Sequence, residues 1–206
     1  MVNIAVFASG NGSNFQAIAD AIKRKRLKAR IALLECDNPG AYVLKRARRE
    51  KVDTLLIERG NYTGKDAYEN AILIQLKKHD VKFIALAGYM RMVGYRLLKA
   101  YKNRIVNIHP ALLPSFKGAD GIGDAMRCGV KVTGVTIHFV NEFMDAGAII
   151  MQAAIEIREG DTKEALAKRV HAVEHIVYPK ALVHLVEGRI KISGRRVKLL
   201  SKRFKG

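Results

Sequence analysis

The stretch Val2-Asn3-Ile4-Ala5-Val6-Phe7-Ala8-Ser9-Gly10-Asn11-Gly12-Ser13-Asn14 joins a short apolar run to a glycine-rich turn. An apolar run of this length that ends in glycine predicts a buried parallel strand over residues 2–8. Apolar residues recur at helical spacing after the turn, so a helix is expected there, with Ser13 or Asn14 as its N-terminal cap. A strand, a glycine turn and a helix in this order indicate an α/β fold.

Apolar runs and helical patterns then alternate as far as residue 108. Further strands are predicted over residues 29–36, 53–57, 82–87 and 104–108. Helices are predicted between them over residues 41–51, 65–79 and 94–101. The apolar face of the middle helix is predicted to include Tyr68, Ile72, Ile74 and Leu76. This alternation predicts right-handed crossovers and a doubly wound, mostly parallel sheet.

The pattern changes after Pro114. Residues 132–140 and 148–157 have extended or alternating patterns, which predict an antiparallel extension of the sheet. The loop between these two strands contains Asp145.

A long helix is expected over residues 162–187, because Asp161-Thr162-Lys163-Glu164 has the pattern of an N-terminal cap. Pro179 is expected to break or kink this helix, since proline lacks the amide hydrogen that a helix interior needs. Residues 189–200 predict a small terminal hairpin that turns at Ser193-Gly194.

Length and composition are those of a folded domain. A chain of 206 residues, of which 49% are hydrophobic, can bury a substantial core. We expect one domain over residues 1–200 and a basic tail over residues 201–206. No apolar run approaches the roughly 18 residues that span a bilayer, and no secretory leader precedes the first strand, so a cytoplasmic protein is expected. Cys36 and Cys128 match no disulfide framework or metal spacing and are expected to be reduced.

The net charge is strongly positive. Lys and Arg number 37 and Asp and Glu 19, which gives +18, and the basic residues cluster within residues 23–30, 45–49 and 195–205. This balance attracts anionic partners, so a nucleic-acid-binding module without catalysis is one alternative function. Aromatic residues do not interleave with the basic ones, and charge clusters also fit solvated helix faces. We therefore expect nucleic acid to bind only non-specifically, if at all.

The turn Gly10-Asn11-Gly12-Ser13-Asn14 has the features of a phosphate cradle. Glycines let the backbone approach an anion, and the amide groups at the start of the next helix point toward it. The turn also resembles the first half of a dinucleotide fingerprint, with Asp37 near the ribose position. Phe15 stands where that fingerprint needs a third glycine, so one phosphate fits better than a pyrophosphate. A glycine turn without a ligand is the alternative.

The segment Asn107-Ile108-His109-Pro110 lies at the end of a predicted apolar strand. Side chains alternate along a strand, so Asn107 and His109 are expected on the same side. Ligands of open parallel sheets collect beyond the carboxyl ends of strands. Asn107 can donate to a developing oxyanion, and protonated His109 can donate to it and supply a proton. A structural histidine is the alternative.

A carboxylate and further histidines are candidates for the same site. Asp145, if close to His109, favours the protonated imidazole. His138 faces either the same pocket or the core. His171, Glu174 and His175 share one face of the long helix, yet they include only one carboxylate, so we expect substrate hydrogen bonds and packing there and no metal.

Several longer motifs resemble the phosphoribosylglycinamide formyltransferase family, the folate-dependent formyltransferases of purine synthesis. The resemblance extends from Val2 to about Leu200. The matching motifs are residues 8–14, Leu86-Ala87-Gly88-Tyr89-Met90-Arg91, residues 106–116 around Asn107-Ile108-His109-Pro110, residues 133–140, Asp145-Ala146-Gly147, and Glu174-His175 with Tyr178-Pro179.

The resemblance implies a Rossmann-like formyltransferase fold, with a phosphate-binding half of about residues 1–100 and a folate and catalytic half of about residues 101–200. It implies two small-molecule substrates, glycinamide ribonucleotide and 10-formyltetrahydrofolate. The implied catalytic residues are Asn107, His109 and Asp145. The implied contacts to glycinamide ribonucleotide are Gly12, Ser13, Asn14, His171 and Glu174. The implied folate site comprises Lys65, Met90, Arg91, Met92, Val93, Asn107, Asn141, Glu142, Phe143, Met144 and Asp145.

Other functions share part of this pattern. Formyltetrahydrofolate hydrolase has the same catalytic residues and uses water as acceptor, but it normally carries a regulatory domain before the strand that begins here at Val2. Methionyl-tRNA formyltransferase adds a tRNA-binding domain after the long helix. A dinucleotide-binding oxidoreductase is disfavoured by Phe15. We therefore expect a formyltransferase that acts on glycinamide ribonucleotide, as a monomer or homodimer.

Overall fold

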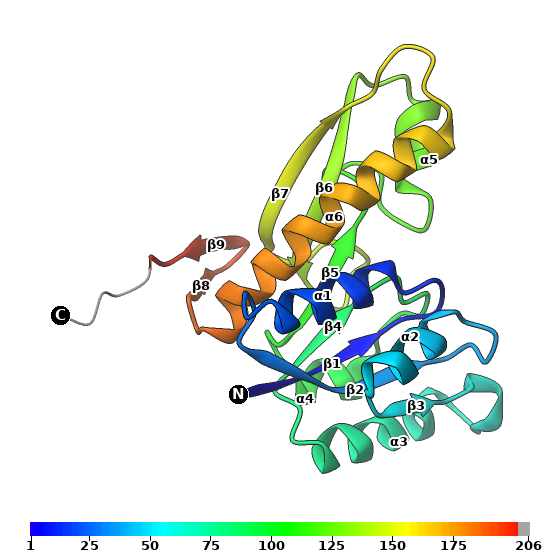
Figure 1. Cartoon of the computed structure of the whole chain (residues 1–206), viewed down its shortest axis with the longest axis vertical. Coiled ribbons are helices and arrows are strands. Elements are labelled where there is room, and N and C mark those ends of the chain that lie inside the picture. The colour runs from blue at the N-terminus through cyan, green and yellow to red at the C-terminus, as the bar shows by residue number, and fades with distance from the viewer. Residues whose placement is uncertain (202–206) are drawn as a thin grey trace.

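The computed structural model describes residues 1–201, so nearly all of the predicted basic tail, residues 202–206, lies outside the described part. Its centre is a seven-stranded sheet in the order β3-β2-β1-β4-β5-β6-β7 (Figure 1). The strands are β1 (Val2–Phe7), β2 (Ala29–Cys36), β3 (Thr54–Leu56), β4 (Phe83–Leu86), β5 (Ile105–His109), β6 (Val132–Phe139) and β7 (Ile149–Glu156). The first five pair in parallel and the last two pair antiparallel, which confirms the predicted mostly parallel sheet and its extension.

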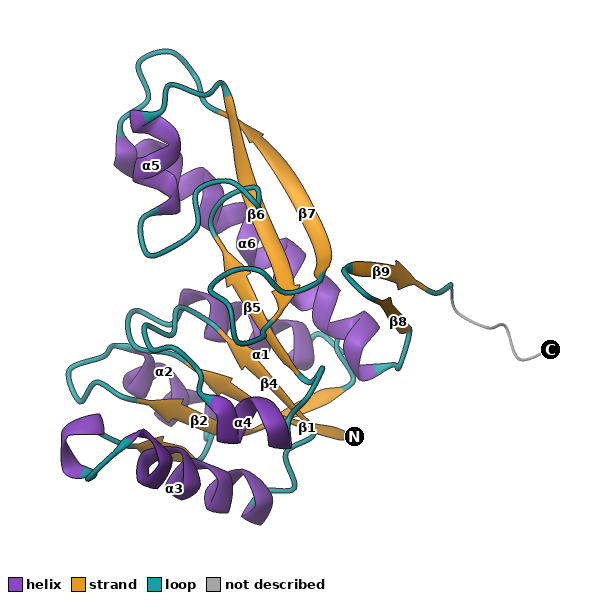
Figure 2. Ribbon diagram, turned by 180° about the vertical axis from the view of Figure 1, so that it is seen from behind, coloured by secondary structure: helices purple, strands orange, loops and turns teal. Residues whose placement is uncertain are grey.

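Helices cover both faces of the sheet. They are α1 (Ser13–Lys23), α2 (Val43–Glu50), α3 (Lys65–Lys78), α4 (Tyr95–Ala100), α5 (Gly121–Arg127) and α6 (Lys163–Val186), with a short 3-10 turn over Arg59–Asn61. One core joins the sheet to α1, α2, α5 and α6, and the other joins it to α3 and α4. Figure 2 shows α4 in front of the strands and α1 behind them. The predicted hairpin is present as β8 (Ile190–Ser193) and β9 (Arg196–Leu199).

Strand β1 explains why the first apolar run is continuous. Ile4 and Val6 pack into the core on the α1 and α6 side, while Ala5 and Phe7 pack into the core on the α3 side. All four side chains are fully buried, because β1 lies between β2 and β4 with helices on both faces. A strand buried on both faces needs apolar residues at every position.

The start of α1 differs from the prediction. Neither Ser13 nor Asn14 caps the helix. The cap residue is Gly12, which has a left-handed backbone with φ of +74°, and no side chain caps the first turn. The tight turn that leads from β1 into α1 requires this conformation, which glycine adopts without steric cost. The first amide groups of α1 therefore remain available at the end of the sheet.

Two further details of the helices were not predicted correctly. Ile74 is 63% exposed, whereas Tyr68, Ile72 and Leu76 are buried. Positions 68, 72 and 76 recur every four residues on one face of α3, and a residue two positions after Ile72 lies on the opposite face. The short helix α5 was not predicted, because its seven residues include two glycines and give no helical apolar pattern.

Helix α6 is not broken at Pro179. It runs without interruption from Lys163 to Val186, with Pro179 buried inside it. The neighbouring Tyr178 is fully buried, and its hydroxyl donates to the carbonyls of Leu86 at 2.8 Å and Val106 at 3.1 Å. These bonds fix the middle of α6 to β4 and β5, so packing compensates for the amide hydrogen that proline lacks.

Among residues 1–201, no helix is long and apolar enough to cross a membrane. Cys36 is buried and Cys128 is exposed, and neither forms a disulfide in the described part of the chain.

Candidate active site

A cavity of about 1200 Å³ opens beyond the carboxyl ends of the parallel strands. Its walls come from the glycine-rich turn before α1, the segment after β4, the end of β5, the loop between β6 and β7, and the first half of α6. A pocket at this edge of an open parallel sheet is the usual place for a ligand.

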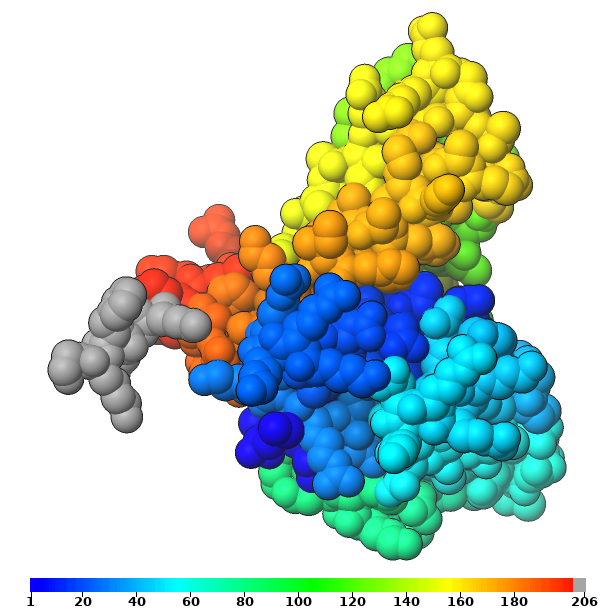
Figure 3. Space-filling model, in the orientation of Figure 1, coloured from blue at the N-terminus to red at the C-terminus, as the bar shows by residue number. Residues whose placement is uncertain are grey.

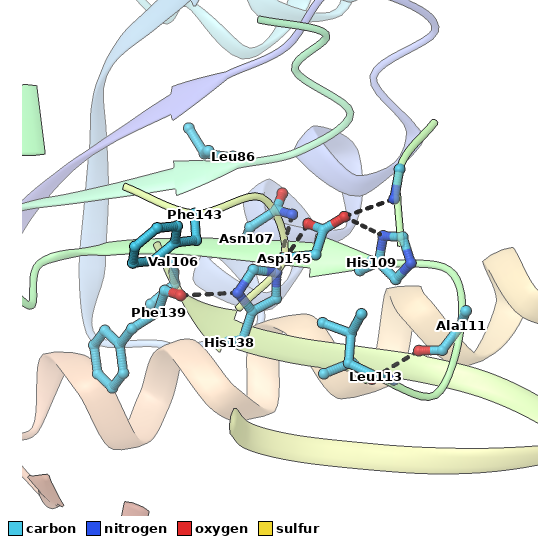
Figure 4. A network of polar contacts seen from close by, with 12 residues as sticks. Leu86, Val106, Asn107, His109, Ala111, Leu113, His138, Phe139, Phe143 and Asp145 are labelled. Carbon is cyan, nitrogen blue, oxygen red and sulfur yellow. Dashed lines mark hydrogen bonds and ion pairs between the residues drawn. The ribbon is translucent and has the colours of Figure 1, made fainter. Parts of the chain in front are cut away.

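Asn107 and His109 lie on the same side of β5, as alternation predicts, and both line the cavity; Ile108 between them packs into the core and borders the cavity as well. His109 is only 3% exposed. Its Nε2–H donates to the carbonyl of Phe116 at 2.7 Å, which leaves Nδ1 facing Asp145. The distance from Nδ1 to Asp145 Oδ2 is 3.5 Å (Figure 4). The imidazole and the carboxylate, 36 residues apart in the chain, therefore meet in the cavity.

Asp145 is held from several directions. Its backbone is left-handed, with φ of +48°, and its Oδ2 accepts from the amide of Gly118 at 2.9 Å. Its Oδ1 lies 3.5 Å from Nε2 of His138. Burial alone raises the pKa of this carboxyl, but the hydrogen bonds from His138 and Gly118 and the charge of His109 together lower the pKa below its usual value. Asp145 is therefore an anion at neutral pH.

His138 joins this network from β6, where it is directly paired with Asn107 of β5. It is 2% exposed, and its Nδ1–H donates to the carbonyl of Phe139 at 2.8 Å. That bond leaves Nε2 to accept from Asn107 Nδ2, which lies 3.2 Å away, or, when protonated, to donate to Asp145. Figure 4 shows Asn107, His109 and His138 around the Asp145 carboxylate. Of the two positions considered for His138, the structure supports the pocket.

The other end of the cavity is formed by the turn before α1 and by α6. The side chain of Asn14 donates to Oε2 of Glu174 at 2.9 Å, and Nδ1 of His171 is 2.9 Å from the same oxygen. The hydrogen bond to Glu174 raises the pKa of His171, although burial opposes this shift. Glu174 is buried, so it holds both side chains beside the amide groups that begin α1. The result is a polar cradle suited to an anion.

Exposed apolar side chains surround a third part of the cavity. Met90 is 70% exposed and Phe143 is 66% exposed, and both line it together with Met92 and Met144. Methionine and aromatic side chains adapt to flat apolar ligands. Arg91 lies among them and pairs with Asp37 at 2.5 Å.

The cavity lining includes most of the residues predicted from the sequence. All three catalytic candidates and all five candidates for the acceptor line it. The folate candidates that line it are Met90, Arg91, Met92, Val93, Asn107, Asn141, Phe143, Met144 and Asp145. Lys65 and Glu142 do not. Lys65 begins α3, and its side chain lies beside Gly94.

Sequence reasoning missed several groups at the site. The carbonyl of Phe116 and the amide of Gly118 contact the central pair through the backbone, which no residue type signals. Lys163 and Lys168 line the cavity from α6. Asp120 caps α5 and pairs with Lys163 at 2.7 Å.

Among residues 1–201, no group of three or more His, Cys, Asp or Glu side chains could hold a metal ion. This holds also for His171, Glu174 and His175, which share one face of α6.

Comparisons with known proteins agree with the family resemblance found in the sequence. Residues 2–182 match the model of a family described as formyl transferase. The chain is 50% identical over 186 residues to a phosphoribosylglycinamide formyltransferase of Bacillus subtilis, and the match covers 90% of this chain and 95% of that protein.

It is 38% identical over 191 residues to the trifunctional purine biosynthetic protein adenosine-3 of Gallus gallus, where the match covers 93% of this chain and 19% of the longer protein. Among solved structures, glycinamide ribonucleotide transformylase 1 of Symbiobacterium toebii superposes with a TM-score of 0.96 at 45% identity, covering 98% of this chain and 95% of that one.

Proposed function

The chain belongs to the formyl transferase family, and from that premise we infer that it is an enzyme of purine biosynthesis that transfers a formyl group to glycinamide ribonucleotide. The observation that best supports this function is the meeting of Asp145, His109 and Asn107 in one cavity that also contains an anion cradle. Acyl transfer to an amine needs both parts, because the amine must be held while charge develops on the acyl oxygen.

The formyl donor is 10-formyltetrahydrofolate. The exposed Met90, Met92, Phe143 and Met144 support a site for its flat ring system beside the catalytic residues. Arg91 lies between Met90 and Met92 in the chain and offers a charge for a carboxylate of the folate, on exchange of its partner Asp37.

The acceptor is held by its phosphate at the start of α1. The amide groups that follow Gly12 and the side chain of Asn14 are donors for the phosphate oxygens, and His171 adds a positive charge. Glu174 contributes indirectly, because it fixes Asn14 and His171. With the phosphate in this position, the rest of the acceptor extends along the cavity toward β5.

The chemistry follows from the remaining groups. The amine nitrogen bonds to the formyl carbon, and the formyl oxygen takes up the negative charge. Asn107 Nδ2–H and His109 Nε2–H stabilise that oxygen, which replaces the Phe116 carbonyl as acceptor for His109. Asp145 faces Nδ1 at 3.5 Å and orients the ring. The bond between the formyl carbon and N10 of the folate then breaks. The amine loses a proton and N10 gains one, and Asp145 relays this proton between them.

The test is a formyl-transfer assay with the purified chain, read by release of tetrahydrofolate. We expect release to require glycinamide ribonucleotide and to yield the formylated nucleotide in equal amount. Release at the same rate with water alone would instead assign a hydrolase, the alternative that shares these catalytic residues. Loss of release in the Gly12→Ala variant with retention in Gly10→Ala would tie the acceptor to the cradle.

We propose that residues 1–200 act as one domain and that the protein works in the cytoplasm, which two cysteines without a disulfide support. Catalysis needs no second subunit for the groups named above, so a monomer and a homodimer are equally compatible with it.

A further inference from the structure

A second cavity lies between α1 and α6, on the far side of the acceptor cradle from the catalytic residues. Its volume is about 630 Å³, within the range of small-molecule sites. Ser13 and His175 line both cavities, so the two share part of a wall. In Figure 3 the atoms of α1 and of the C-terminal half of α6 lie next to each other on the face turned toward the viewer.

The rim of this second cavity is strongly basic. Four cationic side chains line it, namely Arg24, Arg26, Arg46 and Lys180, against a single carboxylate, Asp20. Asp20 already accepts from Gln16 Nε2 at 3.0 Å. Within residues 1–201, Arg24, Arg26 and Lys180 form no ion pair, unlike nearby Lys23, which pairs with Glu50 at 2.6 Å. Three uncompensated cations around one concave surface are suited to more than one phosphate group.

The floor of the cavity is apolar. It is formed by Ala17 and Ala21 of α1 and by Ile176, Pro179 and Val183 of α6. Ile176 is 70% exposed, which is unusual for a large aliphatic residue in the middle of a helix that is otherwise packed against the sheet. An apolar floor within a cationic rim accommodates a flat ring that carries phosphates, and arginine side chains also stack on such rings.

The wall shared with the catalytic cavity has a polar atom that lacks a partner. The Nε2 atom of His175 is buried and makes no hydrogen bond within the described residues. Burial lowers the pKa of this histidine. The charges of His171 and Arg46 lower the pKa further, and the charge of Glu174 opposes this shift. A neutral imidazole with an unpartnered nitrogen can exchange a hydrogen bond with a ligand in the second cavity.

From these features we propose that the groove between α1 and α6 is a second ligand site, which binds a nucleoside diphosphate. The base lies on the floor around Ile176, and the two phosphates meet Arg24, Arg26 and Lys180. Arg46 borders both sites, since its guanidinium donates to the backbone and side-chain oxygens of Asn11 at 2.9 and 3.0 Å. This ligand is distinct from the two substrates of the proposed reaction.

The test is calorimetric titration of the full chain with ADP, adenosine and pyrophosphate at physiological ionic strength, which requires no formyl transfer. The variant Arg24→Glu/Lys180→Glu is compared with Lys77→Glu/Lys78→Glu, which makes the same change of charge on exposed positions of α3. We expect one site for ADP, at least tenfold weaker binding in the α1–α6 variant, and less than a twofold change in the α3 variant. We also expect adenosine and pyrophosphate to bind at least tenfold more weakly than ADP.

A substitution in the apolar floor distinguishes binding of the base from binding of the phosphates. Ile176→Ser is expected to weaken ADP several-fold and to leave pyrophosphate unchanged. Equal weakening by the two charge variants would overturn the proposal, because it would show general attraction to a chain of net charge +18. Displacement of ADP by saturating glycinamide ribonucleotide, absence of saturable binding, or equal affinity for pyrophosphate and ADP would each overturn it as well.

Discussion

Nδ1 of His109, the last residue of β5, lies 3.5 Å from Oδ2 of Asp145, which belongs to the loop between β6 and β7. The carboxylate is fixed by the Gly118 amide and the ring by the Phe116 carbonyl, so neither group turns freely. The pair is therefore preorganised for charge stabilisation beside the cavity.

Replacing either member is expected to reduce turnover strongly. Asp145→Asn keeps the size of the side chain and removes its charge, and His109→Ala removes a donor to the oxyanion. We expect each to lower kcat by roughly 10²- to 10⁴-fold. Turnover is measured by tetrahydrofolate release, and circular dichroism checks that the fold is intact. A folded variant with most of its activity would contradict the assigned roles.

The backbone of Gly12 gives a second prediction. Its φ of +74° is unfavourable for other residues, and a Cβ there would overlap the side chain of Val43. We expect Gly12→Ala to cost about 1 to 3 kcal/mol of stability and to raise the KM for glycinamide ribonucleotide. Gly10→Ala is the control, because a Cβ at Gly10 meets nothing within 4 Å. Thermal unfolding and KM are measured for both.

The double variant Gly12→Ala/Val43→Ala tests how much of the cost comes from the Val43 methyl groups. Removing them relieves the closest contact, with Val43 Cγ2, but leaves the contact with Val43 Cβ at 2.6 Å and the backbone strain, so we expect stability to recover only in part. Equal stability of the Gly10 and Gly12 single variants would show that the turn tolerates a side chain, and the account of the cradle would then be wrong.

Much of the sheet could be predicted from the sequence because its central strands are buried. Strand β2 has the predicted bounds, Ala29–Cys36, since it is rich in Ile and Leu and is followed by a turn. The shared side of Asn107 and His109 was predictable from strand alternation alone. These features depend on local patterns, which a sequence displays directly.

Contacts made by the backbone or by tertiary packing could not be predicted in this way. The bonds from Phe116 and Gly118 to the catalytic pair use main-chain atoms of a segment without periodicity. The unbroken helix at Pro179 depends on the bonds that Tyr178 makes to two strands, which outweigh the local propensity of proline. The second histidine at Asp145, His138, required the register between β5 and β6.

Buried Glu35 of β2 gives a prediction about stability and pH. It is fully buried, and its Oε1 accepts from Tyr68 at 3.0 Å and from Tyr89 at 3.3 Å, while Oε2 has no partner within the described residues. Burial raises the pKa of Glu35 from 4.5 to about 8, with Asp37 adding to the rise and the tyrosine bonds opposing it.

Unfolding therefore releases a proton from Glu35 between pH 4.5 and about 8. Stability from this group is complete below the unfolded pKa and falls as pH rises through the folded one, by roughly 5 kcal/mol in all. Glu35→Gln removes this dependence. Urea unfolding at pH 5.5, 7 and 8.5 is expected to show a smaller decline for the variant than for the wild type. Parallel curves would mean that Glu35 is ionised in the folded protein.

His171 gives the last prediction, which concerns binding of the acceptor. The bond to Glu174 raises the pKa of His171 above its ordinary value of 6.5, so the ring stays cationic at higher pH than a free histidine. As pH rises through that pKa, the cradle loses a positive charge, and the KM for glycinamide ribonucleotide is expected to increase. Because the ring is half exposed, we expect only a two- to fivefold change, of the order seen for exposed ion pairs.

His171→Gln keeps a polar side chain without the charge, so the variant should have the higher KM at a pH where wild-type His171 is still cationic. The ratio of variant to wild-type KM is the quantity to measure, because it cancels the titration of the phosphate, whose second pKa is near 6. The ratio should be largest at low pH and approach one at high pH, with kcat little changed. His184→Gln, in the same helix but outside the cavity, is the matched control. A ratio that does not vary with pH would place the charge of His171 outside the acceptor site and leave the amide groups of α1 and Asn14 as the contacts to the phosphate.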